Sequence, residues 1–138
     1  MITSALTPQR PSETLITTKF RDGVLSGAFS RGGNSRITLT NGEIFINGTH
    51  ASNTATVTMP NSNTVRVELL GIETQHFNIQ DVDSIYFLGR KGHDTFDNDT
   101  TIRANVYGNE GNDSLYAGLG NDNVWGGDGN DVIHGQAG

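Results

Sequence analysis

The residues of this chain best suited to chemistry are carboxylates that recur at a fixed interval near its C-terminal end. In the stretch GGDGNDVIH (residues 126–134), three glycines, two aspartates and an asparagine fill six positions, and Val-Ile follows them. Glycine, Asn and Asp favour turns, whereas Val and Ile favour strands. A turn that carries carboxylates beside a short strand can offer several oxygen ligands to a cation.

The same pattern repeats every nine residues. The full copies are GNEGNDSLY (108–116), AGLGNDNVW (117–125) and GGDGNDVIH (126–134), and GQAG (135–138) begins another. Each full copy has Gly at position four, Asp at position six and an apolar residue at position eight. An earlier copy, GRKGHDTFD (89–97), is followed by ten residues that carry Ala104 where the aspartate belongs. Phased repetition of this kind indicates a repeat architecture.

The nine-residue period predicts how the repeats fold. Six residues rich in Gly, Asn and Asp should form a turn, and three residues with an apolar centre should form a very short strand. One turn and one strand make half a coil, so two repeats complete a circuit. The apolar side chains then stack inward as two short parallel sheets. Because a single coil buries almost no apolar surface, stability must come from neighbouring coils.

Stacked turns also stack their aspartates, and these repel one another unless a cation lies between them. The chain has no Cys, and its four His are not in phase with the repeat, which argues against zinc. Magnesium prefers a few carboxylates plus water, whereas calcium takes six to eight oxygen ligands. The donors in these turns therefore favour Ca²⁺.

The stretch GGDGNDVIH resembles the nonapeptide G-G-x-G-x-D-x-U-x of the repeats-in-toxin (RTX, haemolysin-type) calcium-binding family. The resemblance is specific over 108–138 and weaker over 89–107. It implies an all-β protein with little or no helix, in which a right-handed parallel β-roll (a β-solenoid) binds calcium between turns on the same side. It also implies a bacterial protein that is secreted without an N-terminal signal and folds in extracellular calcium.

The spacing of two repeats predicts which aspartates share an ion. Asp113 and Asp131 are the two phased aspartates that lie 18 residues apart. The resemblance implies that one turn adds carbonyl oxygens from its positions one and three, and the other from its positions two and four. These carbonyl groups belong to Gly108, Glu110, Gly127 and Gly129.

Two further aspartates are candidate ligands. Asp94 lies in the same column, one residue out of phase because of the ten-residue interval, and is expected to form a second site with Asp113. Asp122 lies in the other column, between Ala104 and the terminal Gly138, where no second carboxylate follows. We expect that site to be weak or empty.

The chain divides into three segments by composition. Residues 1–33 are polar without a sustained period, which predicts a flexible or loosely packed lead. Residues 34–88 alternate apolar and polar side chains between turn sequences, which predicts a β-strand-rich lead-in that stacks on the roll. Residues 89–138 hold eight of the fifteen acidic residues and eleven of the eighteen glycines, and form the predicted calcium-binding roll.

Composition also limits the partners. The net charge of −6 over 138 residues disfavours binding to nucleic acid or to an anionic membrane. The sequence contains no apolar run long enough for a membrane span and no N-terminal signal peptide. We therefore expect that the protein stays inside the cell, that it leaves by a route that needs no N-terminal signal, or that the sequence is a fragment. A cell surface, a polysaccharide and end-to-end association through the open ends of the roll are the candidate partners besides calcium.

The leading functional hypothesis is calcium binding through these repeats, with calcium-gated folding of a secreted structural or adhesion module. We predict no enzymatic activity and no cofactor other than Ca²⁺, because the sequence contains no recognisable catalytic constellation. One alternative is the C-terminal repeat region of a secreted enzyme, such as a protease, a lipase or a polysaccharide-modifying enzyme. Another is a β-solenoid with metal-free turns.

Other conspicuous residues receive structural interpretations. His93 and His134 are expected to be exposed, without a role in metal binding. Tyr107, Tyr116 and Trp125 all occupy position nine and could form an exposed ladder for a sugar, but packing around the edge of the roll is the favoured interpretation.

Overall fold

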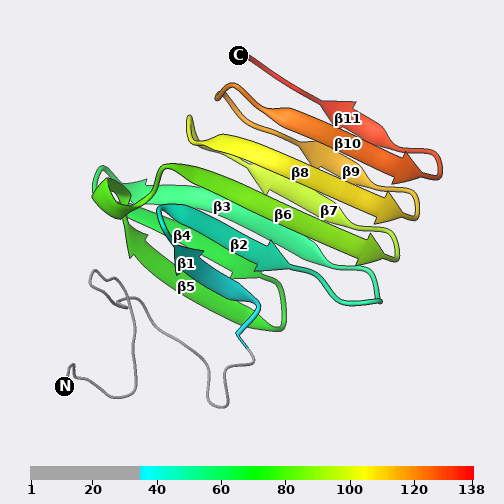
Figure 1. Ribbon diagram of the computed structural model, residues 1–138, viewed down its shortest axis with the longest axis horizontal. Coiled ribbons are helices and arrows are strands. Elements are labelled where there is room, and N and C mark those ends of the chain that lie inside the picture. The colour runs from blue at the N-terminus through cyan, green and yellow to red at the C-terminus, as the bar shows by residue number, and fades with distance from the viewer. Residues whose placement is uncertain (1–34) are drawn as a thin grey trace.

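Alternating apolar and polar residues fold into two β-sheets on either side of one core (Figure 1). The computed structural model describes residues 35–138, so the lead predicted over 1–33 lies outside the described residues. The strands are β1 (Ile37–Thr40), β2 (Glu43–Asn47), β3 (Thr54–Asn61), β4 (Thr64–Leu69), β5 (Glu73–Asn78), β6 (Ser84–Lys91), β7 (Thr95–Asn98), β8 (Arg103–Glu110), β9 (Ser114–Tyr116), β10 (Asn123–Asp128) and β11 (Val132–His134). The 3-10 helix η2 (Ile79–Asp81) is the one helical element in this part of the chain, which confirms the all-β prediction.

Both sheets contain parallel and antiparallel pairs. The strand orders are β1-β2-β6-β8-β10 and β11-β9-β7-β3-β4-β5. Strands β2, β6, β8 and β10 pair in parallel, as do β3, β7, β9 and β11, whereas β1 and the β3-β4-β5 meander are antiparallel. The sequence predicted parallel pairing for the repeats alone. Parallel pairing begins earlier, at β2 and β3, so the described residues form two mixed sheets and not a uniformly parallel array.

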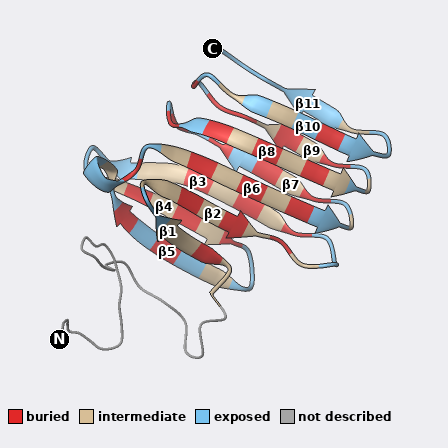
Figure 2. Cartoon of the chain, viewed as in Figure 1, coloured by how far each residue is buried: buried red, intermediate tan, exposed pale blue. Residues whose placement is uncertain are grey.

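Alternate residues of both sheets point into the core (Figure 2). Phe87 of β6 and Phe96 of β7 stack across it, with ring centroids 4.9 Å apart. Most apolar residues at alternate strand positions are buried, whereas Leu39, Met59, Ile79 and Val124 are only partly buried. The core is therefore continuous from the antiparallel end into the repeats.

The core is open at the edge formed by β10 and β11. Ile133 pairs in register with Leu115, yet Ile133 is 46% exposed while Leu115 is fully buried. The difference arises because β11 is the outermost strand of its sheet and has a neighbour on one side only.

The strands extend further into the repeats than the sequence predicted. β8 continues to Glu110 and β10 to Asp128, so the first three positions of these repeats are strand and not turn. The reason is that the parallel register persists there, with Gly127 beside Asn109. Hydrogen bonds between neighbouring strands override the local preference of Gly and Asn for turns.

Gly111 provides a test of how closely successive turns approach. A β-carbon on Gly111 would lie 1.7 Å from the carbonyl oxygen of Gly92, and its φ is +138°. We expect Gly111→Ala to lower the free energy of unfolding by about 3 kcal/mol or more, measured by chemical denaturation. Gly71→Ala is the matched control, because its φ is +76° but nothing lies within 4 Å. Gly71→Ala should lower the free energy of unfolding by about 1 kcal/mol, and an equal loss in both variants would contradict the close approach of the turns at Gly111.

Candidate metal centre

Four turns lie one beside another at one end of the strands, and we call them the turn column. Each leads from a strand of the first sheet to a strand of the second. We count each turn from its position-one glycine, which gives residues 48–53, 89–94, 108–113 and 126–131; the first three residues of the last three segments are the ends of β6, β8 and β10. Their sixth residues are Asn53, Asp94, Asp113 and Asp131.

The aspartates of the turn column are linked through the backbone of the preceding turn. The N–H of Asp113 donates to Oδ1 of Asp131 at 2.9 Å, and the N–H of Asp94 donates to Oδ1 of Asp113 at 2.7 Å. The N–H of Asn53 donates to Oδ1 of Asp94 at 2.7 Å. The structure thus places Asp94, Asp113 and Asp131 in consecutive turns.

The second carboxylate oxygen has no such partner. Within residues 35–138, Oδ2 of Asp94 and Oδ2 of Asp113 are buried and accept no hydrogen bond. Both residues are only 1% exposed. An unpaired buried carboxylate oxygen is costly, so these atoms require a cation or a proton.

Glycines at position one leave space where oxygens converge. A β-carbon on Gly108 would lie 2.2 Å from Oδ2 of Asp113 and 2.6 Å from the carbonyl oxygen of Gly126. A β-carbon on Gly89 would lie 2.5 Å from Oδ2 of Asp94 and 2.6 Å from the carbonyl oxygen of Gly108. In each of two successive gaps between turns, a carboxylate oxygen and a carbonyl oxygen therefore face the same space. Such oxygen donors suit Ca²⁺.

The other expected ligands lie in these turns as well. Gly127 and Gly129 have φ of +99° and +129°, a region that favours glycine. Asn109 adopts φ of +79° at the position equivalent to Gly127. The side chain of Glu110 is exposed and forms an ion pair with Lys91, so its carboxylate is engaged outside the gaps.

The acidic side chains of the turn column are spread over successive turns and do not form one cluster. Among residues 35–138, no group of three or more His, Asp or Glu side chains is placed to hold a metal ion. Because calcium takes six to eight oxygen ligands, a calcium site in the turn column would need backbone carbonyl oxygens or water besides its carboxylates.

Burial changes the acidity of the column aspartates. It raises the pKa of Asp94 from 3.8 to about 6, against the opposing effect of the Asn53 N–H, and the nearby carboxylate of Asp113 raises it further. Burial likewise raises the pKa of Asp113, and the carboxylate of Asp131 adds to this. Both shifts reflect negative charge held in a poorly solvated place.

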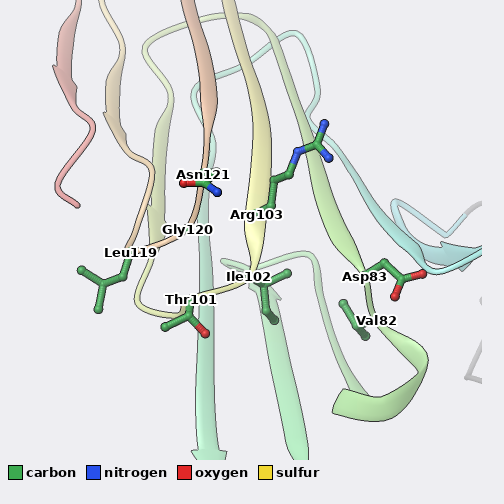
Figure 3. Close-up of a pocket in the computed structure, with 8 residues that line it drawn as sticks. All are labelled: Val82, Asp83, Thr101, Ile102, Arg103, Leu119, Gly120 and Asn121. Atoms are coloured by element: carbon green, nitrogen blue, oxygen red, sulfur yellow. The ribbon is translucent and has the colours of Figure 1, made fainter. Parts of the chain in front are cut away.

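Asp122 lies in a turn at the opposite end of the strands, between β9 and β10. Its Oδ1 accepts the N–H of Ala104 at 2.8 Å, its Oδ2 is buried without a partner in the described chain, and burial raises its pKa. The turn before it carries Ala104 and no carboxylate at the matching position. An open hollow at this end of the strands is lined by Val82, Asp83, Thr101, Ile102, Arg103, Leu119, Gly120 and Asn121 (Figure 3). Asp122 therefore lacks the carboxylate neighbour that Asp113 has.

Sequence reasoning missed the first turn of the column, residues 48–53. Gly48 precedes Asn53 by five residues, as Gly89 precedes Asp94, and this spacing was the available signal. Strands β4 and β5 separate that turn from the next one and hide the repetition.

Position five forms a second ladder that the sequence did not indicate. Ser52 Oγ accepts the N–H of His93 at 2.9 Å, and Nδ1 of His93 accepts the N–H of Asn112 at 2.9 Å. Oδ1 of Asn112 accepts the N–H of Asn130 at 2.8 Å. His93 is thus an exposed residue that links neighbouring turns.

The position-nine aromatics stack on one another. Tyr107 and Trp125 have ring centroids 4.5 Å apart and planes 4° apart, and Tyr116 stacks on His134 at 4.7 Å. The ring faces cover each other along the two sheets, and Trp125 on the outermost strand β10 is 48% exposed.

Comparison with known proteins identifies the C-terminal segment. Residues 107–138 match the model of the RTX calcium-binding nonapeptide repeat in four copies. No curated protein and no solved structure matches the chain. The matched repeat is a calcium-binding structural motif, and Ca²⁺ is the ion that it binds. Over residues 35–138 no helix is long and apolar enough to cross a membrane.

The pKa shifts predict an unusual pH dependence without calcium. Because the pKa of Asp94 is higher in the folded state (about 6) than its ordinary value of 3.8, folding favours the protonated form. The stability that this group contributes is present below pH 3.8 and is lost as the pH rises to about 6. Chemical denaturation in chelator should show a falling free energy of unfolding across that range. Excess calcium should remove or reverse the decline, and a rise in chelator would contradict the prediction.

Proposed function

Residues 107–138 carry RTX calcium-binding nonapeptide repeats, and from this premise we propose that calcium binds between successive turns of the turn column and controls the folding of a right-handed parallel β-roll. The observation that carries the proposal is the pair of buried Oδ2 atoms of Asp94 and Asp113, in consecutive turns, that accept no hydrogen bond from residues 35–138. A divalent ion would neutralise charges that otherwise repel one another.

Two calcium sites are assigned to the column. The first lies between the last two turns, where Asp113 and Asp131 would act together with carbonyl oxygens of Gly108, Glu110, Gly127 and Gly129. The second lies between Asp94 and Asp113, which repeat the same backbone link. A weaker third site at Asp122 has one carboxylate and one backbone contact, to Ala104.

The mechanism we propose is linkage between ion binding and folding. Without calcium, each turn must hold a carboxylate in a poorly solvated place beside another. The free energy of calcium binding then becomes free energy of folding for the repeats. Residues 89–138 would respond most strongly, and residues 34–88 would serve as the lead-in on which the roll stacks.

The expected affinity suggests where the protein works. Calcium modules of extracellular proteins bind with Kd on the order of 10⁻⁴–10⁻³ M. Such sites would stay largely empty at low calcium inside cells and fill outside them. We therefore propose a secreted structural or adhesion module without catalytic activity of its own, which folds where calcium is abundant.

Calcium titration calorimetry tests the two-site assignment. Asp113 belongs to both sites, whereas Asp94 and Asp131 each belong to one. We expect Asp113→Asn to weaken both binding events and Asp131→Asn to weaken one, because Asn keeps Oδ1 for the neighbouring N–H but removes the charge. Asp97→Asn, an exposed outward position on β7, is the matched control and should bind like wild type. Wild-type stoichiometry in Asp113→Asn would reject the assignment.

Circular dichroism tests the gated folding. Chelator should reduce the β-sheet signal of the full chain, and calcium should restore it. A spectrum that does not respond to either addition would instead favour a metal-free solenoid.

A further inference from the structure

The first turn of the turn column, residues 48–53, follows the geometry of the others without a carboxylate. A β-carbon on Gly48 would lie 2.4 Å from the carbonyl oxygen of Gly89 and 2.8 Å from Oδ1 of Asn53. The same two kinds of oxygen therefore meet at Gly48 as at Gly89 and Gly108, but here one belongs to a neutral amide. This turn lies outside the matched repeats.

Asn53 needs no cation, because its side-chain oxygen is already satisfied. Oδ1 of Asn53 accepts the N–H of Thr49 at 2.6 Å and the hydroxyl of Thr49 at 3.2 Å. The equivalent Oδ2 atoms of Asp94 and Asp113 have no partner in residues 35–138. The first turn is thus closed by its own hydrogen bonds, whereas the next two turns are not.

A positive side chain closes the outer side of this turn. Nη1 of Arg36 donates to the carbonyl oxygen of Gly48 at 2.7 Å and to that of Asn47 at 3.4 Å. Arg36 lies beside β2 on the side away from β6, because its carbonyl oxygen accepts the N–H of Asn47 at 2.8 Å. The guanidinium group therefore stands at the end of the column and binds carbonyl oxygens there, as a metal ion would do between inner turns.

Glu73 holds Arg36 in this position. The N–H of Arg36 donates to Oε1 of Glu73 at 3.0 Å, and the hydroxyl of Ser35 donates to Oε2. Nε2 of Gln75 donates to the same Oε2 at 2.9 Å. Since Glu73 belongs to β5 and residues 35–36 lead into β1, these contacts join the two sheets at the end opposite β10 and β11.

We propose that turn 48–53, closed by the guanidinium group of Arg36 in place of a metal ion, folds without calcium and is the template on which the calcium-dependent turns assemble. The template role rests on the proposed function. The metal-free folding of turn 48–53 does not, because the bonds that close it, from Arg36 to Gly48 and from Thr49 to Asn53, involve none of the proposed calcium ligands.

Hydrogen exchange of the full chain, followed by mass spectrometry in chelator and in calcium, tests the proposal. In chelator, we expect the amides of residues 47–53 to stay protected while those of residues 108–131 exchange rapidly. Calcium should then protect residues 108–131. Equal, rapid exchange of both segments in chelator would overturn the proposal, since the first turn would then also depend on metal.

Variants of Arg36 test the role of the guanidinium group. In chelator, Arg36→Met should speed the exchange of residues 47–53 by about tenfold or more, because it removes a charge-assisted hydrogen bond. The calcium concentration needed to protect residues 108–131 should rise several-fold. Arg36→Lys should restore part of both properties. Arg66→Met is the matched control, because Arg66 forms a surface ion pair with Glu68 on β4 at 2.8 Å, and it should change neither.

The outcomes separate this proposal from the proposed function. If calcium leaves the exchange of residues 108–131 unchanged, calcium-gated folding fails, and the template role fails with it, whatever Arg36 does. If calcium protects those residues but Arg36→Met exchanges like wild type in chelator, the role of Arg36 fails alone. If Arg36→Met does not fold even in calcium, the wild-type comparison of residues 47–53 with residues 108–131 in chelator decides.

Discussion

Buried carboxylate oxygens without a hydrogen-bond donor are the constraint on which the rest of this structure depends. In the middle of the turn column, one oxygen of each aspartate accepts an N–H from the preceding turn, which fixes the orientation of the carboxylate. The other oxygen of Asp94 and of Asp113 then faces a gap between turns, away from water. Negative charge in such a place is unfavourable unless a cation or a proton joins it. The stability of these turns is therefore inseparable from what fills the gaps.

The remaining features of the repeats follow from this constraint. Glycine at position one lets carboxylate and carbonyl oxygens occupy space that a side chain would otherwise fill, as at Gly108. Phe96 and Leu115, two positions after Asp94 and Asp113, are fully buried and join their turns to the core. Electrostatics in the turns and apolar packing between the sheets thus act on the same short segments.

The two ends of the fold differ in how they are closed. At one end, the guanidinium group of Arg36 binds the carbonyl oxygen of Gly48, and Glu73 of the second sheet accepts the N–H of Arg36. At the other end, Ile133 occupies a core position and is still 46% exposed. Unpaired carboxylate oxygens occur in turns between these ends. This polarity fits a molecule in which order spreads from a closed end toward turns that require an ion.

The sequence by itself determined the all-β class, the nine-residue unit and the calcium-binding character of the repeats. These depend on local properties, namely the turn preference of Gly, Asn and Asp and the phase of one apolar residue, and the match over residues 107–138 agrees with them. Alternation also identified most of the core, because side chains of a strand point to opposite faces.

Tertiary structure alone decided the pairing of strands before the repeats and the full membership of the turn column. The sequence did not reveal that Asn53 lies beside Asp94, because β4 and β5 intervene in the chain. In the structure the N–H of Asn53 donates to Oδ1 of Asp94. Nor did the sequence show that the parallel register extends back to β2 and β3, or that Arg36 reaches Gly48. Contacts between residues far apart in the chain depend on how sheets stack, and no local preference encodes that arrangement.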